Sequence, residues 1–347
     1  MPALPDQLPD SRIADPRSAP PLRWGVLAPG WIARAFADAL RKHTAQDLAA
    51  VGSRSAERGA RFAADFGIER VHDSYPALVE DPAVDVVYVA SPHSEHRDHA
   101  LLAIAAGKHV LIEKAFAQTA AQAAEIARAA AAAGVVVMEA MWSRFLPHYD
   151  VVRQLLADGA LGELVTVTAD HGQYFDFDPQ FRLFNPDLAG GALLDLGIYP
   201  ISFASFVQGA PTGITASGTL ASTGVDGQVS AVLDSTSGLQ AVVNTTLFAK
   251  TPTVAAISGT GARIEIAGDF YNPQPITLID RDGHGRRRWD ANTIFGHEGL
   301  AYEAAELARI VTDGRTESDL LPVAESVAIM GTLDELRRQV GAVLPGD

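Results

Sequence analysis

The strongest constraint on the fold is a regular alternation of short apolar stretches and longer helical ones between residues 23 and 140. The apolar stretches are RWGVLA, DLAAVGS, VDVVYVAS, HVLIEK and GVVVMEA. Near-continuous apolar strands are typical of a parallel sheet that is buried on both faces, and the segments between them have the apolar spacing of amphipathic helices. We therefore predict an α/β fold of the Rossmann type, a doubly wound parallel sheet with helices on both faces.

After about residue 145 the apolar pattern has a period of two. Segments such as ELVTVTADHGQY, GQVSAVLDST and ARIEIAG alternate apolar and polar residues between glycine turns, and two helical stretches close the chain. This pattern predicts a second, α+β domain with an open-faced, mostly antiparallel sheet. The expected divisions are a flexible proline-rich arm over 1–20, a Rossmann-type domain over 21–145 and the α+β domain over 146–347.

Charge and composition narrow the classes of partner. A formal charge of −15 over 347 residues opposes binding to nucleic acid or to an anionic membrane, because phosphates are bound by clustered Lys and Arg. We find no apolar run that approaches the ~20 residues needed to span a bilayer. The arm lacks the apolar core of a signal peptide, so we expect a cytoplasmic protein. Without cysteine, disulfides, thiol catalysis and cysteine-ligated metals are excluded.

The first apolar stretch ends in a turn that has part of a phosphate-binding pattern. Residues 27–33, LAPGWIA, carry Gly30 where the pattern G-x-G-x-x-G/A needs its second glycine, but Ala28 stands at the first. A pyrophosphate would bind the free amides at the start of the following helix. An alanine at position 28 requires a φ suited to a residue with a Cβ, and a plain strand-to-helix turn is the alternative. The candidate contacts are Ala28, Gly30, Trp31 and Ile32.

The end of the second apolar stretch discriminates between the two nicotinamide dinucleotides. NAD-binding folds usually carry Asp or Glu there to bond the ribose hydroxyls. This chain instead has Ser53 and Arg54, with Arg58 one helical turn later. A hydroxyl and guanidinium groups suit a 2′-phosphate, so NADP is favoured over NAD. A solvated helix start is the alternative.

A histidine-rich turn, SPHSEHRDH, follows the third apolar stretch. Its histidines recur at intervals of three, but His93 and His99 would diverge by roughly 120° around a helix. No carboxylate or cysteine of matching spacing accompanies them, so we predict no metal site. We expect a turn that faces the cofactor. Its candidate contacts are Ser91, Pro92, His93 and His96.

Two pairs of ionisable residues are candidates for the chemistry. Glu113 and Lys114 end a buried strand, where charges are rare unless they are paired or functional. In GGALLDLGIYP, Asp195 and Tyr199 lie one helical turn apart on one face. The structural alternatives are a salt bridge at the sheet rim for the first pair, and a helix cap with a half-buried tyrosine for the second.

Taken together, GKHVLIEK, EAMWSRF and FRLFNPDLAGGALLDLGIYP resemble the Gfo/Idh/MocA oxidoreductases. The likeness covers residues 21 to about 345 and is greatest to the branch with dimeric dihydrodiol dehydrogenase and the NADP-dependent D-xylose dehydrogenases. It implies a Rossmann domain, an open-sheet domain and an active site between them. It also implies that Lys114, Asp195 and Tyr199 are the family's lysine, aspartate and acid/base tyrosine.

The resemblance implies hydride transfer between NADP and a pyranose, polyol or diol. Tyr199 would be the acid/base, with the ammonium of Lys114 lowering the pKa of a phenol from its usual ~10. Asp195 would orient the substrate or the lysine. Our other candidate contacts are Glu113, Lys114, Trp142 and Arg144 for the cofactor, and Lys114, His171, Phe175, Arg182, Asp195 and Tyr199 for the substrate.

Other readings stay open beside this one. An enzyme could retain its cofactor and use transient redox for glycoside elimination or hydrolysis, or a non-catalytic protein could sense NADP. The complete set of Lys114, Asp195 and Tyr199 favours an enzyme. The resemblance also implies a homodimer through the open sheet, consistent with one apolar outer face on the strands over 227–267. Ala115 stands where the family commonly has proline, which leaves the shape of the lysine turn open.

Overall fold

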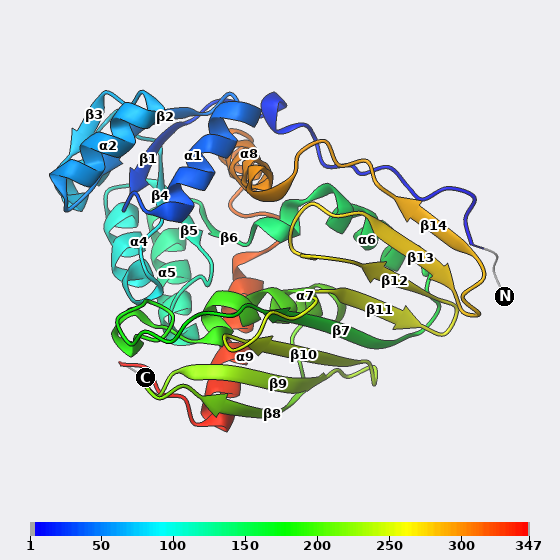
Figure 1. Ribbon diagram of the computed structural model, residues 1–347. Helices are drawn as coiled ribbons and strands as arrows, with labels where there is room; N and C mark the ends of the chain where they lie inside the picture. The colour runs from blue at the N-terminus through cyan, green and yellow to red at the C-terminus, as the bar shows by residue number, and fades with distance from the viewer. Residues whose placement is uncertain (1–3, 346–347) are drawn as a thin grey trace. The chain divides into compact units, whose positions relative to one another are not determined.

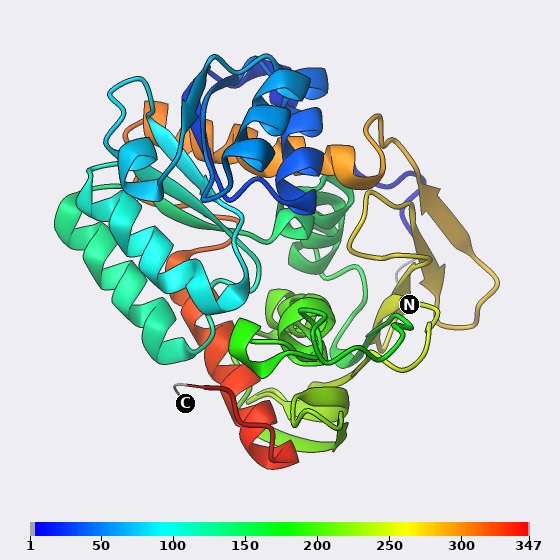
Figure 2. The ribbon, with the colours of Figure 1, turned by 60° about the vertical axis from the view of Figure 1, so that its left-hand side comes forward.

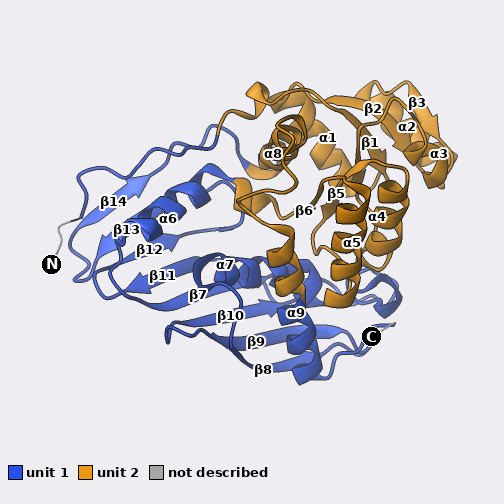
Figure 3. Cartoon of the chain, turned by 180° about the vertical axis from the view of Figure 1, so that it is seen from behind, with its two compact units in different colours: residues 1–13, 146–295, 331–347 blue, residues 14–145, 296–330 orange. Residues whose placement is uncertain are grey.

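A computed structural model describes residues 4–345 of the protein, which divides into two compact units (Figure 3). Unit 1 comprises residues 1–13, 146–295 and 331–347, and unit 2 comprises residues 14–145 and 296–330. Each unit is built on one large sheet.

The sheet of unit 2 has six strands. They are β1 Arg23–Leu27, β2 Asp47–Gly52, β3 Arg70–His72, β4 Val86–Val89, β5 His109–Glu113 and β6 Val137–Ala140. The strand order is β3-β2-β1-β4-β5-β6, and every neighbouring pair is parallel. Apolar strands such as β4 are buried along their whole length, because helices cover both faces. The predicted doubly wound sheet is confirmed.

Helices α1, α2, α4 and α5 connect these strands, and α8 joins them from the far end of the chain. Because the strand order reverses at β1, right-handed crossovers place α1 and α2 on one face and α4 and α5 on the other. α4 packs against α5, and α8 packs against α1 (Figures 1 and 2). The bounds are α1 Trp31–His43, α2 Ala56–Phe66, α3 Tyr75–Val79, α4 His96–Ala105, α5 Ala120–Ala133 and α8 Leu300–Thr312, with short 3₁₀ turns η1 Pro16–Ser18, η2 His93–Glu95, η3 Trp142–Phe145 and η6 Gly296–Gly299.

The sheet of unit 1 has eight strands in the order β14-β13-β12-β11-β7-β10-β9-β8. β7 and β10 are parallel, and the other neighbouring pairs are antiparallel. The predicted mostly antiparallel sheet is confirmed, with one parallel pair that the pattern did not indicate. The bounds are β7 Leu164–Gly172, β8 Gly213–Leu220, β9 Asp226–Asp234, β10 Gln240–Thr246, β11 Ala255–Gly259, β12 Ala262–Ile266, β13 Ile276–Asp280 and β14 Arg286–Trp289.

Helix α7, Ile198–Gln208, packs against β7 and β10. It continues directly from η5, Leu193–Gly197, which is a π-helical turn. Such turns are rare and occur frequently at functional sites. The remaining helical elements are α6 Pro147–Ala157, η4 Pro186–Leu188 and α9 Val323–Val340, whose second half belongs to unit 1.

The division into units differs from the expected boundary at residue 145. Residues 296–330, expected in the second domain, belong to unit 2. The physical reason is packing: α8 contacts α1, and its Ala305 and Ala308 form a buried cluster with Ala19. The sequence pattern also missed β3 and β14, because RVH and RRRW carry almost no apolar periodicity.

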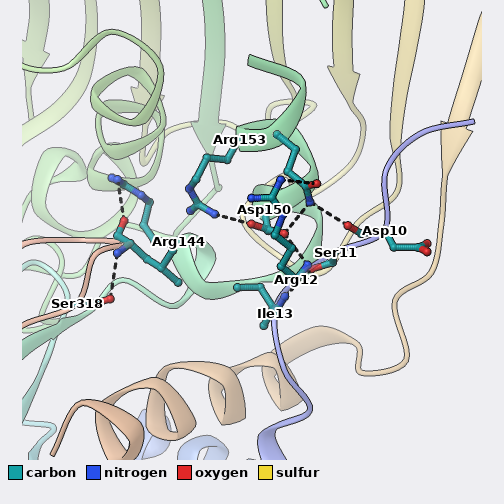
Figure 4. Close-up of polar contacts among 10 residues, drawn as sticks. Asp10, Ser11, Arg12, Ile13, Arg144, Asp150, Arg153 and Ser318 are labelled. Atoms are coloured by element: carbon teal, nitrogen blue, oxygen red, sulfur yellow. Dashed lines mark hydrogen bonds and ion pairs between the residues drawn. The ribbon is translucent and has the colours of Figure 1, made fainter. Parts of the chain in front are cut away.

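The proline-rich arm is held along the part that the structure describes, residues 4–20, in place of the expected flexible segment. Within unit 1, Asp150 of α6 accepts a hydrogen bond from the backbone amide of Arg12 at 2.7 Å (Figure 4). Within unit 2, the guanidinium of Arg309 donates to the carbonyl of Asp15 at 2.8 Å. The first three residues of the expected arm lie outside the described residues.

The outward face of the open sheet is polar, so the expectation of an apolar outer face over 227–267 is wrong. Apolar residues of β9 and β10 such as Val229 and Val243 point inward and are buried. Period two places their neighbours outward, and most of those are polar: Gln228, Ser230, Asp234, Gln240, Asn244 and Thr246. The apolar exceptions are Val242, which is 46% exposed, and its half-buried cross-strand neighbour Val232.

One segment corrects the expectation that no apolar run has membrane length. Pro186–Gln208 is long and apolar enough to cross a bilayer, by length and composition alone, and it is mostly buried inside the protein. Since α7 packs beneath the sheet, this apolar character is accounted for by the core of unit 1.

Candidate active site

The turn after β1 holds the candidate phosphate loop in unit 2. Ala28 has a φ of 66°, in the left-handed region that favours glycine, so the expectation of a φ suited to a Cβ is wrong. The amide of Gly30 donates to the carbonyl of Ala28 at 2.8 Å, which closes the turn before α1 begins at Trp31. The backbone thus adopts a glycine-like turn although the residue is alanine.

Gly30 borders open space at the start of α1. A Cβ built on Gly30 would meet only the carbonyl oxygen of Ala28 within 4 Å, at 3.9 Å. α1 has no side-chain cap and no acidic residue in its first turn, so its first amides are available to an anion. These features fit the pyrophosphate of a dinucleotide beside Gly30, Trp31 and Ile32.

Arg54 and Arg58 follow β2, the strand next to β1, and both are exposed. The guanidinium carbon of Arg54 lies 5.7 Å from the ring centre of Tyr75. Ser53 is buried, and its hydroxyl accepts the amide two residues further on at 3.1 Å. Two exposed guanidinium groups, with no carboxylate at the end of β2, fit a 2′-phosphate.

His93 and His96 fasten the turn after β4 to the turn after β5. His93 Nε2 lies 3.1 Å from the carbonyl oxygen of Lys114, and His96 Nδ1 lies 2.9 Å from that of Ala115. His96 Nε2 faces a third carbonyl, that of Ser91, at 2.9 Å. Burial is the main cause that lowers the pKa of His96 to about 4, so its ring is neutral and donates to one of its two carbonyls.

His96 therefore differs from the expected cofactor contact. Its side chain is fully buried and both ring nitrogens face backbone carbonyls, so it positions the turn that bears Lys114. The three histidines do not converge, because His99 Nδ1 instead lies 2.9 Å from the hydroxyl of Ser91. Pro92 precedes η2 and shapes the same turn. Within residues 4–345, no three His, Asp or Glu side chains gather to hold a metal ion.

Glu113 and Lys114 stand at the carboxyl end of β5. Glu113 is buried and accepts hydrogen bonds from the hydroxyl of Tyr88, on β4, and from the amide of Lys114 at 3.1 Å. The peptide between Lys114 and Ala115 is cis. Glu113 thus ties the start of the lysine turn to the neighbouring strand.

Arg144, expected at the nicotinamide, is buried in an ion pair. Its guanidinium bonds both carboxylate oxygens of Glu325, at 2.8 and 3.1 Å. It also donates to the carbonyl of Leu320 at 3.2 Å, next to the turn that contains Ser318 (Figure 4). The structure therefore uses Arg144 to join η3 to α9 within unit 2.

His297 is a residue that the sequence reading missed. Its ring stacks on Trp142, with centroids 5.7 Å apart and 14° between the planes, and meets the edge of Trp31 at 5.1 Å. Trp142 is buried, whereas Trp31 is 68% exposed. No local motif marks His297, because η6 reaches these tryptophans only through the packing of residues 296–330 within unit 2.

In unit 1, the segment GGALLDLGIYP forms the π-helical turn and the start of α7. Asp195 is buried in that turn, and its carboxylate lies 3.0 Å from the guanidinium of Arg182. The side chain of Arg182 is 49% exposed. The structure thus joins two residues that the sequence indicated separately, and the arginine balances the carboxylate charge.

Tyr199 lies in a stack of aromatic rings. Its centroid is 4.3 Å from that of Tyr271 and 5.5 Å from that of His171. His171 Nδ1 lies 3.2 Å from the carbonyl oxygen of Leu196, and its Nε2 lies 3.1 Å from the side-chain amide nitrogen of Gln173. A neutral ring that donates from Nδ1 and accepts at Nε2 satisfies both contacts, and we assign that tautomer.

Tyr271 was not expected at this site. Burial, followed by the charges of Asp269 and Asp195, raises the pKa of Tyr271 well above its usual value. Tyr271 is therefore a protonated phenol beside Tyr199. Only the packing of the segment after β12 against α7 reveals it.

Phe175 lies in the loop between β7 and η4. It is half-buried, and its ring centroid is 6.0 Å from that of Phe181, which is 39% exposed. The same loop supplies Arg182 to Asp195. Aromatic rings beside a carboxylate–guanidinium pair suit a ligand that has both apolar faces and hydroxyl groups.

Two family models match the chain. The model described as an oxidoreductase family with an NAD-binding Rossmann fold matches residues 22–141, and the GFO/IDH/MocA C-terminal domain matches residues 149–269. A trans-1,2-dihydrobenzene-1,2-diol dehydrogenase from Xenopus tropicalis is 34% identical over 93% of this chain and 99% of its own length. The chain belongs to the Gfo/Idh/MocA oxidoreductase family.

Further relatives of this Gfo/Idh/MocA protein cover nearly its whole length. A D-xylose 1-dehydrogenase (NADP(+)) from Hypocrea jecorina is 35% identical, and the match covers 93% of this chain and 93% of that relative. The crystal structure of a 3-ketoreductase from Actinomadura kijaniata, in complex with NADP and TDP-benzene, is 26% identical. Its TM-score is 0.82 over 92% of this chain and 98% of that one. The predicted family and fold are confirmed.

Proposed function

We propose that this Gfo/Idh/MocA protein is an NADP-dependent oxidoreductase that transfers hydride between the nicotinamide and a pyranose, polyol or diol. The observation that carries the proposal is the helical segment of unit 1, which holds Asp195 against Arg182 and Tyr199 against Tyr271. Relatives at 34% and 35% identity are named as a diol dehydrogenase and an NADP-dependent D-xylose dehydrogenase, which supports both the reaction and the substrate class.

In the proposed mechanism, Tyr199 takes the proton of a substrate hydroxyl and returns it in the reverse reaction. NADP, when bound, supplies the acceptor or donor of the hydride. A free phenol has a pKa of ~10, so we assign Lys114 the task of stabilising the phenolate. Asp195, held by Arg182, binds substrate hydroxyls; it is not the base, because a carboxylate beside a phenolate opposes its ionisation.

The decisive variant is Tyr199→Phe, assayed by absorbance at 340 nm with NADP+ and a panel of aldoses, polyols and trans-diols. Loss of the acid/base is expected to lower kcat by at least about 100-fold. The Kd for NADPH, from fluorescence titration, should stay unchanged because the candidate cofactor contacts lie in unit 2. The control is Tyr174→Phe, which removes a hydroxyl from a 63% exposed tyrosine and should keep the wild-type kcat.

Each other outcome has a distinct meaning. Full turnover by Tyr199→Phe would show that Tyr199 is not the acid/base. If the wild type bound NADPH tightly and cleaved glycosides without net reduction, the transient-redox enzyme would replace the dehydrogenase. Tight binding of NADPH with no turnover of any substrate would indicate a sensor.

Cofactor preference is tested at the end of β2. Arg54→Ala should lower kcat/KM for NADP+ by at least about ten-fold, because a guanidinium–phosphate contact is lost, and should leave that for NAD+ unchanged. Arg61→Ala is the matched control, since Arg61 is an exposed arginine of α2 paired with Glu57 at 2.6 Å. A wild type that prefers NAD+ would overturn the assignment of Ser53, Arg54 and Arg58 to a 2′-phosphate.

A further inference from the structure

The helical segment that carries Asp195 and Tyr199 begins without a local cap. Ala192 precedes η5, and no side chain next to it in sequence bonds the first amides. The first amides of a helix have no partner within the helix and need an acceptor from elsewhere. Here the acceptor comes from a strand. Asp226, the first residue of β9, accepts a hydrogen bond from the amide of Leu193 at 2.6 Å.

Asp226 is closely fitted to this position. It is only 1% exposed, and the nearby amide of Ala192 opposes the rise of its pKa, although its Oδ1 accepts no hydrogen bond within residues 4–345. Gly191, directly before the segment, has a φ of 120°, and a Cβ there would lie 2.2 Å from Asp226 Oδ1. The second glycine of GGALLDLGIYP is therefore required by the close approach of this carboxylate as well as by its own backbone conformation.

A buried countercharge faces Asp226 from another element. Arg337, in the second half of α9, is 2% exposed and attracts Asp226, and it pairs with Asp334 at 2.7 Å. Burial is the largest cause that raises the pKa of Asp226 to about 7, while the amide of Leu193 and the charge of Arg337 oppose that rise. A carboxylate is costly to bury, so its retention here requires these specific partners.

We propose that Asp226 is a positioning residue, which fixes the start of the segment Ala192–Gln208 and thereby the place where Asp195 and Tyr199 are presented. The inference rests on the proposed function in so far as these two side chains act on the substrate. Asp226 itself does not touch the reacting atoms. Because misplacing a catalytic group by about 1 Å costs up to ~100-fold in rate, loosening this helix start should lower kcat.

The test uses Asp226→Asn and Asp226→Ala in the full chain, with amide hydrogen exchange and steady-state kinetics measured on the same samples. In Asp226→Ala, the amide of Leu193 should exchange at least about ten-fold faster, and kcat should fall at least about ten-fold. Asp226→Asn keeps an acceptor oxygen and should lie between wild type and Asp226→Ala in both measurements. The Kd for NADPH should stay within about two-fold, because its candidate site lies in unit 2.

The matched control is Asp280→Ala, which removes a carboxylate bonded to the amides of His284 and Gly285 in the turn between β13 and β14. It should change neither the exchange at Leu193 nor kcat. The proposal is overturned if exchange at Leu193 is unaltered, or if it quickens while kcat stays at the wild-type value. Should Asp226→Ala fail to fold, Asp226→Asn meets the same two criteria.

Failure of the proposed function is recognised separately. If the wild type turned over no sugar or diol, the function would be wrong, whereas amide exchange would still show whether Asp226 caps the segment. If the wild type were active and the variants kept both protection and rate, only the positioning role would fall.

Discussion

At the scale of the residue, Ala28 occupies a backbone conformation that an alanine adopts only at a cost. Its φ of 66° places its Cβ close to the backbone, whereas glycine meets no such penalty. We therefore expect Ala28→Gly to raise the free energy of unfolding by about 0.5–1 kcal/mol, after allowing for the greater freedom of glycine in the unfolded chain. Urea unfolding followed by circular dichroism measures this change.

The control for this substitution is Ala132→Gly in α5, at an exposed position of a regular helix. There the same change should lower the free energy of unfolding by about 1 kcal/mol. Opposite signs at the two positions would identify the left-handed turn as the cause. A loss of stability at both positions would show that Ala28 does not hold this conformation.

At the scale of the element, β5, β6 and α8 each bury one glutamate inside unit 2, namely Glu113, Glu139 and Glu303. Glu139 of β6 accepts hydrogen bonds from the amide of Phe116 at 3.1 Å and from the hydroxyl of Ser326 at 2.6 Å. Glu303 of α8 is fully buried, and neither of its carboxyl oxygens has a hydrogen-bond partner within residues 4–345. Burial, then the charges of Glu113 and Glu139, raise the pKa of Glu303 well above its ordinary value.

Glu139 predicts a pH dependence of stability that one substitution should reduce. Burial is the main cause that raises the pKa of Glu139 from 4.5 to about 7. The folded chain then binds this proton more tightly than the unfolded chain, so the contribution of Glu139 to stability falls as pH rises from 4.5 to 7 and stays low above that range.

Glu139→Gln mimics the protonated acid, so its stability relative to wild type should increase across this pH range. Urea-unfolding midpoints at several pH values between 4.5 and 8 measure the difference. Glu163→Gln, at an exposed position before β7, is the control and should follow the wild type at every pH. A constant difference between Glu139→Gln and wild type would contradict a raised pKa at Glu139.

At the scale of the whole molecule, both edges of the open sheet of unit 1 are occupied. Gln339 of α9 bonds the backbone of β8 at Ile214 and Ala216, at 2.9 and 2.7 Å. At the other edge, Arg287 of β14 donates to the carbonyls of Pro5 and Asp6 in the arm. Edge-to-edge pairing with a second chain is thus opposed.

A homodimer through the outward face of the open sheet stays a prediction, as does a cytoplasmic location. We expect sedimentation equilibrium to give twice the chain mass of 36.7 kDa. Val242→Asp should shift the equilibrium toward the monomer, because it places a charge at the exposed apolar position of β10. Val343→Asp, at a 70% exposed position near the end of the chain, should leave the mass unchanged. A monomeric wild type would refute the dimer.

The apolar pattern by itself determined the class of each sheet, most of its strands and most of its helices. A sheet that is buried on both faces leaves a different apolar period in the sequence from a sheet that is buried on one face, so the pattern distinguishes the two. The pattern also located residues of chemical interest at strand ends, such as Gly30, Arg54 and Lys114, because the carboxyl ends of parallel strands meet at one edge. Asp195 and Tyr199 were found because four residues make about one helical turn.

Only the tertiary structure decided which distant residues meet. It placed His297 on Trp142, Tyr271 on Tyr199 and Asp226 at the amide of Leu193, and it committed Arg144 to Glu325. Periodicity and turn chemistry act over a few neighbouring residues, whereas these contacts join segments that are brought together by the packing of a whole unit. For the same reason the sequence could not assign residues 296–330 to unit 2: the partner of an apolar helix face is set by the core it completes, not by the helix itself.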